Sequence, residues 1–151
     1  MQVLKQGFIA GHSTRLGRHG GRLALVALLA WPGMAAAQSV SDVHFEAGNY
    51  GTMVSGSVVG DGFADYRLGA NGGQKMFAEL SVTESNGDGT VYFNILPPNS
   101  SDAAIYNSSM DGNSTTVNLP SDGTYTIRVY QMGNDADAGK TSSFNLDLSI
   151  Q

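Results

Sequence analysis

Two pairs of aspartates come closest to a spacing at which side chains could do chemistry: Asp61 with Asp65, and Asp135 with Asp137. Two carboxyl groups that face each other across a cleft, roughly 5 to 10 Å apart, can act as the acid and base of glycoside hydrolysis. Here each pair lies within one short segment beside turn-forming residues, and loop neighbours on a small domain rarely face each other across a cleft. The pairs therefore do not predict catalysis.

Histidine and cysteine chemistry is equally sparse in this sequence. His44 is the single histidine after residue 37, so a serine–histidine–acid triad or a histidine metal site would have to be built around it. No Gly-x-Ser-x-Gly nucleophile motif is present. The chain contains no cysteine, which excludes a thiol nucleophile, a disulfide framework and a cysteine zinc site. We therefore predict that the protein has no catalytic residues and is not an enzyme.

The aspartates could instead bind calcium, which prefers several oxygen ligands. The runs Asn86-Gly87-Asp88-Gly89 and Asp111-Gly112-Asn113, however, lack the ligand spacing and closing glutamate of a helix–loop–helix calcium site. Asn, Asp and Gly are also the residues that tight turns require. We predict turns at these positions, with no metal and no cofactor, and a calcium-stabilised secreted domain stays open as an alternative.

The first 37 residues have the composition of a secretory signal peptide. A basic start is followed by the short apolar run 23–31 and by Ala35-Ala36-Ala37, whose small residues suit signal peptidase. The apolar run is well below the roughly 20 residues that span a bilayer, so no stable membrane insertion is expected. We predict cleavage after Ala37 and export of residues 38–151, as a single domain, to the periplasm or the medium.

The charge of residues 38–151 is strongly negative. Four Lys and Arg residues stand against thirteen Asp and Glu residues, which gives a net charge of −9. Nucleic acid is not an expected partner, because its phosphate backbone is bound by clustered Lys and Arg. A cationic protein would be attracted by the long-range field of such a chain.

Apolar residues recur with a period of two, as in β-strands with one buried face. The pattern is clear in the runs 75–82, 91–95, 125–129 and 144–150, and weaker in 43–47, 52–59, 63–70, 103–106 and 115–119. Clusters of Asn, Asp and Gly between the runs suit hairpin turns. We predict an all-β fold, an antiparallel β-sandwich or flattened barrel of about eight or nine short strands.

Motifs that extend over most of residues 43–150 can be compared with a known family. They are Ser55-Gly56 followed by Gly60 and Tyr66, Gly73-Gln74-Lys75, Leu119-Pro120, Gly123-x-Tyr125-x-Ile127-Arg128-Val129-x-Gln131, Asn134-Asp135-Ala136, Lys140-Thr141, and Phe144-Asn145-Leu146-Asp147-Leu148-x-Ile150. This set resembles the periplasmic inhibitors of goose-type lysozyme, the PliG family. The Gly-x-Tyr-x-Ile-Arg-Val strand is also similar to pre-peptidase C-terminal β-sandwiches, whereas its combination with Gln131 and Asn134-Asp135-Ala136 is more specific.

The resemblance implies a monomeric, periplasmic β-sandwich that blocks the substrate groove of a lysozyme with loops at one end. Its partner would be the lysozyme, a basic protein that suits the acidic charge of this chain. The loop from Gln131 to Lys140 would enter the groove beside Ser55-Gly56 and the turn that follows them. The expected contact residues are Ser55, Gly56, Asp61, Gln131, Asn134, Asp135 and Asp137.

The chain departs from the family pattern within these loops. In the family, the loop carries arginines around the Asn-Asp-Ala core, and the turn after Ser-Gly carries an aromatic residue. Gly133, Asp137 and Asp61 stand at these places here. An alternative function is an accessory module that binds polysaccharide or an envelope protein. Its expected contact residues are Tyr92, Tyr106 and Tyr130.

Overall fold

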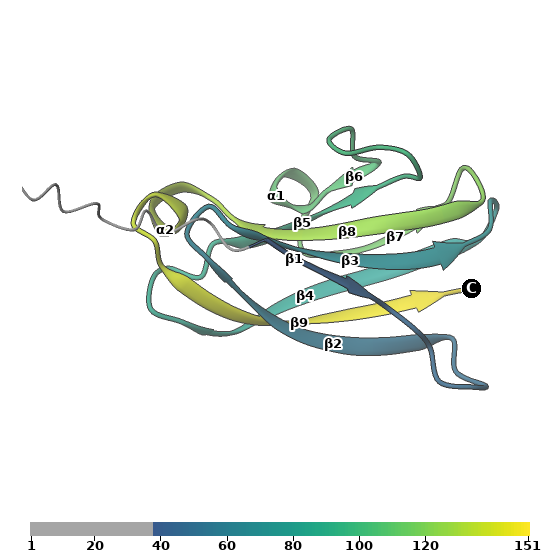
Figure 1. The fold of residues 1–151 in the computed structure, drawn as a ribbon, viewed down its shortest axis with the longest axis horizontal. Coiled ribbons are helices and arrows are strands. Elements are labelled where there is room, and N and C mark those ends of the chain that lie inside the picture. The colour runs from purple at the N-terminus through teal and green to yellow at the C-terminus, as the bar shows by residue number, and fades with distance from the viewer. Residues whose placement is uncertain (1–37) are drawn as a thin grey trace, which may run out of the picture. The chain divides into compact units, whose positions relative to one another are not determined.

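The computed structural model describes residues 38–151, which form two β-sheets packed face to face (Figure 1). The strands are β1 Gln38–Asp42, β2 Gly51–Val59, β3 Phe63–Ala70, β4 Lys75–Ser85, β5 Val91–Leu96, β6 Tyr106–Asn107, β7 Ser114–Asn118, β8 Gly123–Gln131 and β9 Thr141–Ile150. Two short helices are α1 Ser108–Asp111 and α2 Gly133–Asp137. The predicted signal peptide, residues 1–37, lies outside the described residues.

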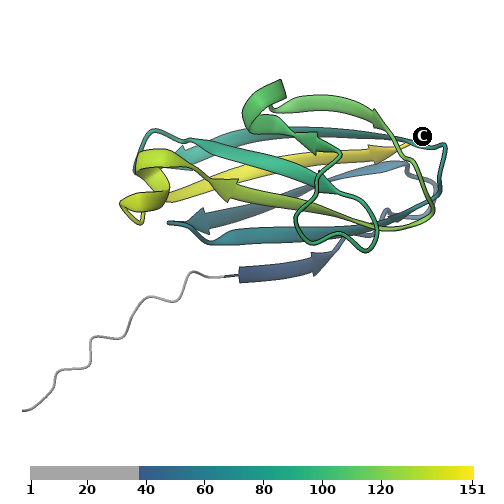
Figure 2. The same ribbon diagram turned by 90° about the horizontal axis from the view of Figure 1, so that it is seen from above.

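One sheet has the strand order β1-β3-β8-β5-β6, and the other has the order β2-β9-β4-β7. The sheets stay separate, so the sandwich prediction is confirmed and the flattened barrel is not formed. Figure 2 shows the strands running along the long axis of the domain, with α2 at one end and the C-terminus at the other. Within residues 38–151, no helix is long and apolar enough to cross a membrane.

The core lies between the two sheets. Its residues confirm that the four clear period-two runs are strands with one buried face. The buried side chains on the inner faces include Met76, Ala78, Leu80, Val91, Phe93, Ile95, Tyr125, Ile127, Val129, Phe144, Leu146, Leu148 and Ile150. Val82 was expected on the same face but is 38% exposed. Val82 still pairs in register with the buried Phe144, and the register of β4 against β9 shifts only after it, between Val82 and Glu84.

The N-terminal strand differs from the sequence-based expectation. The run 43–47 was predicted as a weak strand, but the strand is β1, whose five residues are all exposed. It pairs with β3 in parallel, whereas the other strand pairs of the described residues are antiparallel. Val43 produced the apolar signal because its side chain is buried, and its N–H continues the pairing to the Arg67 carbonyl at 2.8 Å.

Candidate partner-binding site

Three chain connections meet at the end of the sandwich that carries α2, here called the α2 end (Figure 1). They are the β2–β3 turn (60–62), the β4–β5 loop (86–90) and the β8–β9 connection (132–140), which contains α2. The turn is joined to the connection by a hydrogen bond of 2.8 Å from the Gly60 N–H to the Lys140 carbonyl. The predicted neighbourhood of the 131–140 loop and this turn is therefore present in the structure.

The β4–β5 loop is joined to the same connection by side-chain hydrogen bonds. The Asn86 side-chain oxygen accepts from the Thr141 N–H at 2.8 Å. The Thr90 hydroxyl donates to the Met132 carbonyl at 2.7 Å. Segments that are more than 40 residues apart in sequence are thus held side by side, which limits the freedom of the exposed loops before any partner arrives.

Asp135 is the central acceptor of the α2 end. Its side chain is only 2% exposed, and its carboxylate accepts from the N–H groups of Asp88 at 2.9 Å and Thr90 at 3.0 Å. The Thr90 hydroxyl is a further donor at 3.1 Å. These bonds, the Thr90 N–H foremost and then the Asp88 N–H, lower the pKa of Asp135 because they stabilise its charged form. A side chain at Gly87 would collide with this carboxylate, so the loop needs glycine there.

Gln131 has a similar internal role on the other side of the connection. Its side chain is 4% exposed, and its amide nitrogen donates to the carbonyls of Lys140 at 2.8 Å and Gly60 at 3.2 Å. Its amide oxygen accepts from the Ser142 hydroxyl at 2.7 Å. Gln131 thereby gives the carbonyl of Gly60, a buried residue of the β2–β3 turn, a hydrogen-bond partner.

The 131–140 loop therefore buries Gln131 and Asp135, two of the residues expected to contact the partner. Both side chains point into the protein, and their polar atoms form internal hydrogen bonds. The helix α2 was also missed, because five residues are too few to show a helical period. The sequence carried no signal for the role of Asp135, since its donors lie 45 and 47 residues upstream.

Ser55 and Gly56 lie in the middle of β2 and not in the turn that follows. The exposed Ser55 hydroxyl donates to the Asn145 side chain at 2.7 Å on the outer face of the sheet. A Cβ on Gly56 would collide with the Tyr66 hydroxyl and come within 2.9 Å of Cζ of Phe144. Gly56 therefore serves packing between the sheets, and the structure does not gather this pair with the other predicted contact residues.

The residues left exposed at the α2 end give it an acidic, polar surface. Asp61, Asp88, Asn134 and Asp137 are exposed there, one or more from each connection. Lys140 is the one basic residue in the three connections, and it is only partly exposed. Such a surface can donate and accept hydrogen bonds and can pair with cations.

The predicted acid pairs do not form facing carboxylates. Asp65 lies in β3 and binds Arg128 of β8 through two hydrogen bonds of 2.8 Å. Arg128 also covers the Phe63 ring at 4.0 Å from its centre. The hydrogen bond to Asp65 raises the pKa of Arg128, because it stabilises the charged guanidinium. Asp61 lies in the exposed turn, and Asp135 is buried, so neither pair is arranged for glycoside hydrolysis.

The three tyrosines of the alternative function do not share one surface. Tyr92 and Tyr130 are neighbours on the outer face of the five-stranded sheet, with ring centres 6.4 Å apart. Tyr106 instead packs against the core residue Phe93, at 5.6 Å between ring centres. Its hydroxyl donates to the Gly112 carbonyl at 2.6 Å. Tyr106 therefore does not lie on the surface that Tyr92 and Tyr130 share.

Calcium is expected to leave the stability of the protein unchanged. Among the described residues, no group of three or more His, Asp or Glu side chains is close enough to hold a metal ion. Melting curves in excess chelator and in millimolar calcium should therefore coincide. A structural calcium site would separate them, because ligand at about 100 times its dissociation constant adds about 2.7 kcal/mol to the free energy of unfolding.

Acid is expected to remove the stabilising effect of the Asp135 carboxylate. Because folding lowers its pKa, the effect is fully present above the unfolded pKa of about 3.9 and is lost as the pH falls through the folded value. The difference in melting temperature between wild type and Asp135→Asn should be widest near neutral pH and shrink below about pH 4. A difference that stays constant from neutral pH to strong acid would contradict this role of the charge.

Fold and site together define a β-sandwich binding protein, with preorganised loops at one end and no catalytic constellation among the residues described. A curated relative, the inhibitor of g-type lysozyme from Escherichia coli (strain K12), is 32% identical over 127 residues, which are 84% of this chain and 92% of the relative. The chain belongs to this family, the inhibitors of g-type lysozyme. No family model matches the sequence.

Solved structures agree with this assignment. The PliG of Aeromonas hydrophila, a periplasmic inhibitor of g-type lysozyme, superposes with a TM-score of 0.69 at 29% identity, covering 78% of this chain and all of that one. The Salmonella Typhimurium PliG gives a TM-score of 0.59 at 27% identity, covering 75% of this chain and 98% of that one. The predicted resemblance to the PliG family is therefore confirmed.

Proposed function

We propose that this protein is a periplasmic inhibitor of g-type lysozyme, which protects peptidoglycan by occupying the substrate groove of the lysozyme with its α2 end. The observation that carries the proposal is the 32% identity over 127 residues to an inhibitor of g-type lysozyme. The hydrogen-bonded loops of the α2 end support it, because a rigid projection loses little conformational entropy on binding. We expect a monomer that is exported after removal of residues 1–37.

The residues of the α2 end divide into two roles in this proposal. Gln131 and Asp135 are positioning residues, because their polar atoms are already bonded within the protein. Asn134, Asp137 and Asp61 are the contact residues, because their side chains are exposed. Preorganised contacts of this kind favour a slow dissociation of the complex.

Charge assigns different places to the contact residues. A groove that cleaves glycosidic bonds contains carboxylates, which would repel Asp61 and Asp137. We infer that the neutral amide of Asn134 faces the catalytic carboxylates and that Asp61 pairs with a cation at the rim of the groove. Asp137 lies beside a carboxylate of the groove, which repels it. The net charge of −9 for residues 38–151 would accelerate the encounter with a basic lysozyme, and this acceleration should weaken as salt is added.

The proposal is tested by a lysis assay with goose-type, chicken-type and invertebrate-type lysozymes, with and without purified residues 38–151. We expect the goose-type enzyme to be inhibited at much lower concentrations than the other two. Full lysis by the goose-type enzyme at every inhibitor concentration would overturn the proposal. The accessory module would then be the better account, and the adjacent Tyr92 and Tyr130 would be its first candidate contacts.

Replacing Asn134 with alanine should weaken inhibition by about 1 to 3 kcal/mol, the usual cost of leaving a buried polar partner without its hydrogen bond. Asn134 is exposed, and its side chain makes no hydrogen bond to another of the residues 38–151, so the melting temperature should not change. Inhibition constants measured for wild type and Asn134→Ala provide the test. Asp147→Asn, an exposed change in the middle of β9, is the matched control and should inhibit like wild type.

A further inference from the structure

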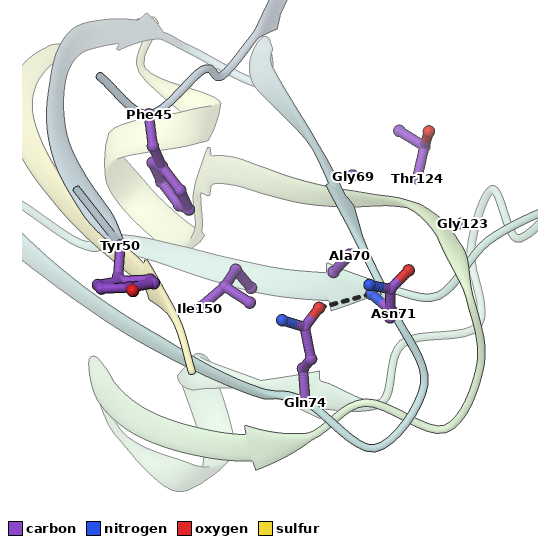
Figure 3. A pocket seen from close by; sticks show the side chains of 9 residues that line it. All are labelled: Phe45, Tyr50, Gly69, Ala70, Asn71, Gln74, Gly123, Thr124 and Ile150. Carbon is purple, nitrogen blue, oxygen red and sulfur yellow. Dashed lines mark hydrogen bonds between the residues drawn. The ribbon is translucent and has the colours of Figure 1, made fainter. Parts of the chain in front are cut away.

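A concave feature lies at the end of the sandwich opposite the α2 end. It is a pocket of about 620 Å³ between the two sheets (Figure 3). Ala70 at the end of β3, Gly123 at the start of β8 and Ile150 at the end of β9 contribute to its walls. The other terminus of each of these strands lies at the α2 end. The pocket is therefore separate from the proposed inhibitory surface. Its volume is in the range of small-molecule sites.

Aromatic side chains form one side of this pocket, and amides form the other. Figure 3 shows Phe45 and Tyr50 on one side, Asn71 and Gln74 on the other, and Ile150 between them. Tyr50 is 76% exposed although it is a large aromatic residue. Both aromatic residues come from the connection between β1 and β2, outside any strand.

The amide side is held in place by a hydrogen bond. The Gln74 side-chain oxygen accepts from the Asn71 N–H at 2.7 Å. Within residues 38–151, the Gln74 NH₂ group makes no hydrogen bond, so it can donate into the pocket. None of the described residues that line the pocket carries a charge. The neighbouring hollow contains Arg67, but its guanidinium is already paired with Asp42 at 2.8 Å.

Gly69 leaves the pocket wall without a side chain where the fold does not require glycine. It lies within β3, its φ is not in the left-handed region, and a Cβ there would meet nothing within 4 Å. Glycine inside a strand weakens the strand and often marks a place where a ligand approaches the backbone closely. Gly123 is different, because its φ of 139° and the nearby Pro98 explain it through the fold alone.

We propose that this pocket binds an uncharged saccharide. A pyranose ring has apolar C–H faces that pack against an aromatic ring, and hydroxyl or acetamido groups at its edge that need amide partners. Phe45 and Tyr50 supply the aromatic rings, and Asn71 and Gln74 supply the amide groups. An anionic ligand lacks a free cation here, and an aliphatic chain would leave the amides unpaired, which costs binding energy.

The proposal is tested by titrating ¹⁵N-labelled residues 38–151 with tri-N-acetylchitotriose, and separately with cellotriose, while recording ¹H–¹⁵N spectra. At least one trisaccharide should bind with a dissociation constant of about 1 mM and shift the amides of residues 69–74 and 123–124. Tyr50→Ala and Gly69→Leu should each raise this constant at least about tenfold. Gly69 is part of the pocket wall, and a Cβ there meets nothing within 4 Å, so Gly69→Leu adds a bulky side chain at the pocket without a clash in the fold.

Tyr92→Ala is the matched control, because it removes a tyrosine from the outer sheet face and should bind the trisaccharide like wild type. Inhibition of goose-type lysozyme should be the same for Tyr50→Ala, Gly69→Leu and wild type, so the result does not depend on the proposed function. The inference is overturned if neither trisaccharide shifts any amide at about 20 mM. It is also overturned if the shifts surround Tyr92, if Gly69→Leu binds unchanged, or if decanoate binds the pocket more tightly than either sugar.

Discussion

The Asp135→Ala variant is expected to melt more than about 10 °C below wild type, although Asp135 lies in a surface connection. The change leaves the N–H groups of Asp88 and Thr90 without their acceptor in a place where the aspartate is only 2% exposed, while the Thr90 hydroxyl keeps the Met132 carbonyl. Unpaired buried donors are among the few causes of large single-site destabilisation. Thermal melts of wild type and Asp135→Ala provide the measurement.

The Asp135→Ala variant should also lose inhibition, in addition to having a lower melting temperature. Without the Asp135 carboxylate, the 86–90 loop separates from α2, and the exposed contact residues lose their fixed positions. Asp137→Ala is the control, because it removes an exposed carboxylate from the same helix without an internal hydrogen bond and should melt like wild type. An Asp135→Ala protein that melts at the wild-type temperature would show that the buried carboxylate does not hold the α2 end together.

The Asp137→Arg variant is expected to bind a goose-type lysozyme at least about tenfold more tightly than wild type. Asp137 stands where the resemblance to the family implies an arginine, and it is exposed on α2. Arginine can pair bidentately with a carboxylate of the groove, whereas aspartate repels it. Inhibition constants at low and high salt measure the effect, which should shrink as ionic strength rises.

Asp147→Arg controls for the change in net charge, since it makes the same substitution on the outer face of β9, away from the α2 end. It should inhibit no better than wild type. If Asp137→Arg weakens inhibition instead, position 137 meets a cation of the partner and not a carboxylate. If both arginine variants gain equally, the contact is non-specific and the assignment of Asp137 to the interface is wrong.

The period-two pattern predicted the core strands because each inner face repeats apolar residues over several positions. Tyr125, Ile127 and Val129 of β8 are all fully buried, as the alternation requires. β1 escaped prediction because its Gln-Ser-Val-Ser-Asp sequence has no buried face, so it adds only backbone pairing to β3. A strand held by hydrogen bonds alone has no apolar pattern to detect.

The roles within the site were harder to predict than its position. The family resemblance of the sequence implied that the 131–140 loop lies beside the β2–β3 turn, and the Gln131 amide forms that link by bonding the Gly60 and Lys140 carbonyls. It could not separate contact residues from positioning residues, because an aspartate in a polar loop looks the same whether it is buried or exposed. Asp135 and Asp137 are two residues apart, yet one is 2% exposed and the other faces solvent.

The most direct test of the central claim is hydrogen–deuterium exchange of residues 38–151, free and in complex with a goose-type lysozyme. The account predicts that protection on binding is confined to the α2 end, in the segments 60–62, 86–90 and 132–140. The start of β2 around Tyr50 and the outer sheet face around Tyr92 should exchange at the same rate in both states. Protection centred on either of these regions, with the 132–140 segment unchanged, would contradict the claim that the α2 end blocks the lysozyme.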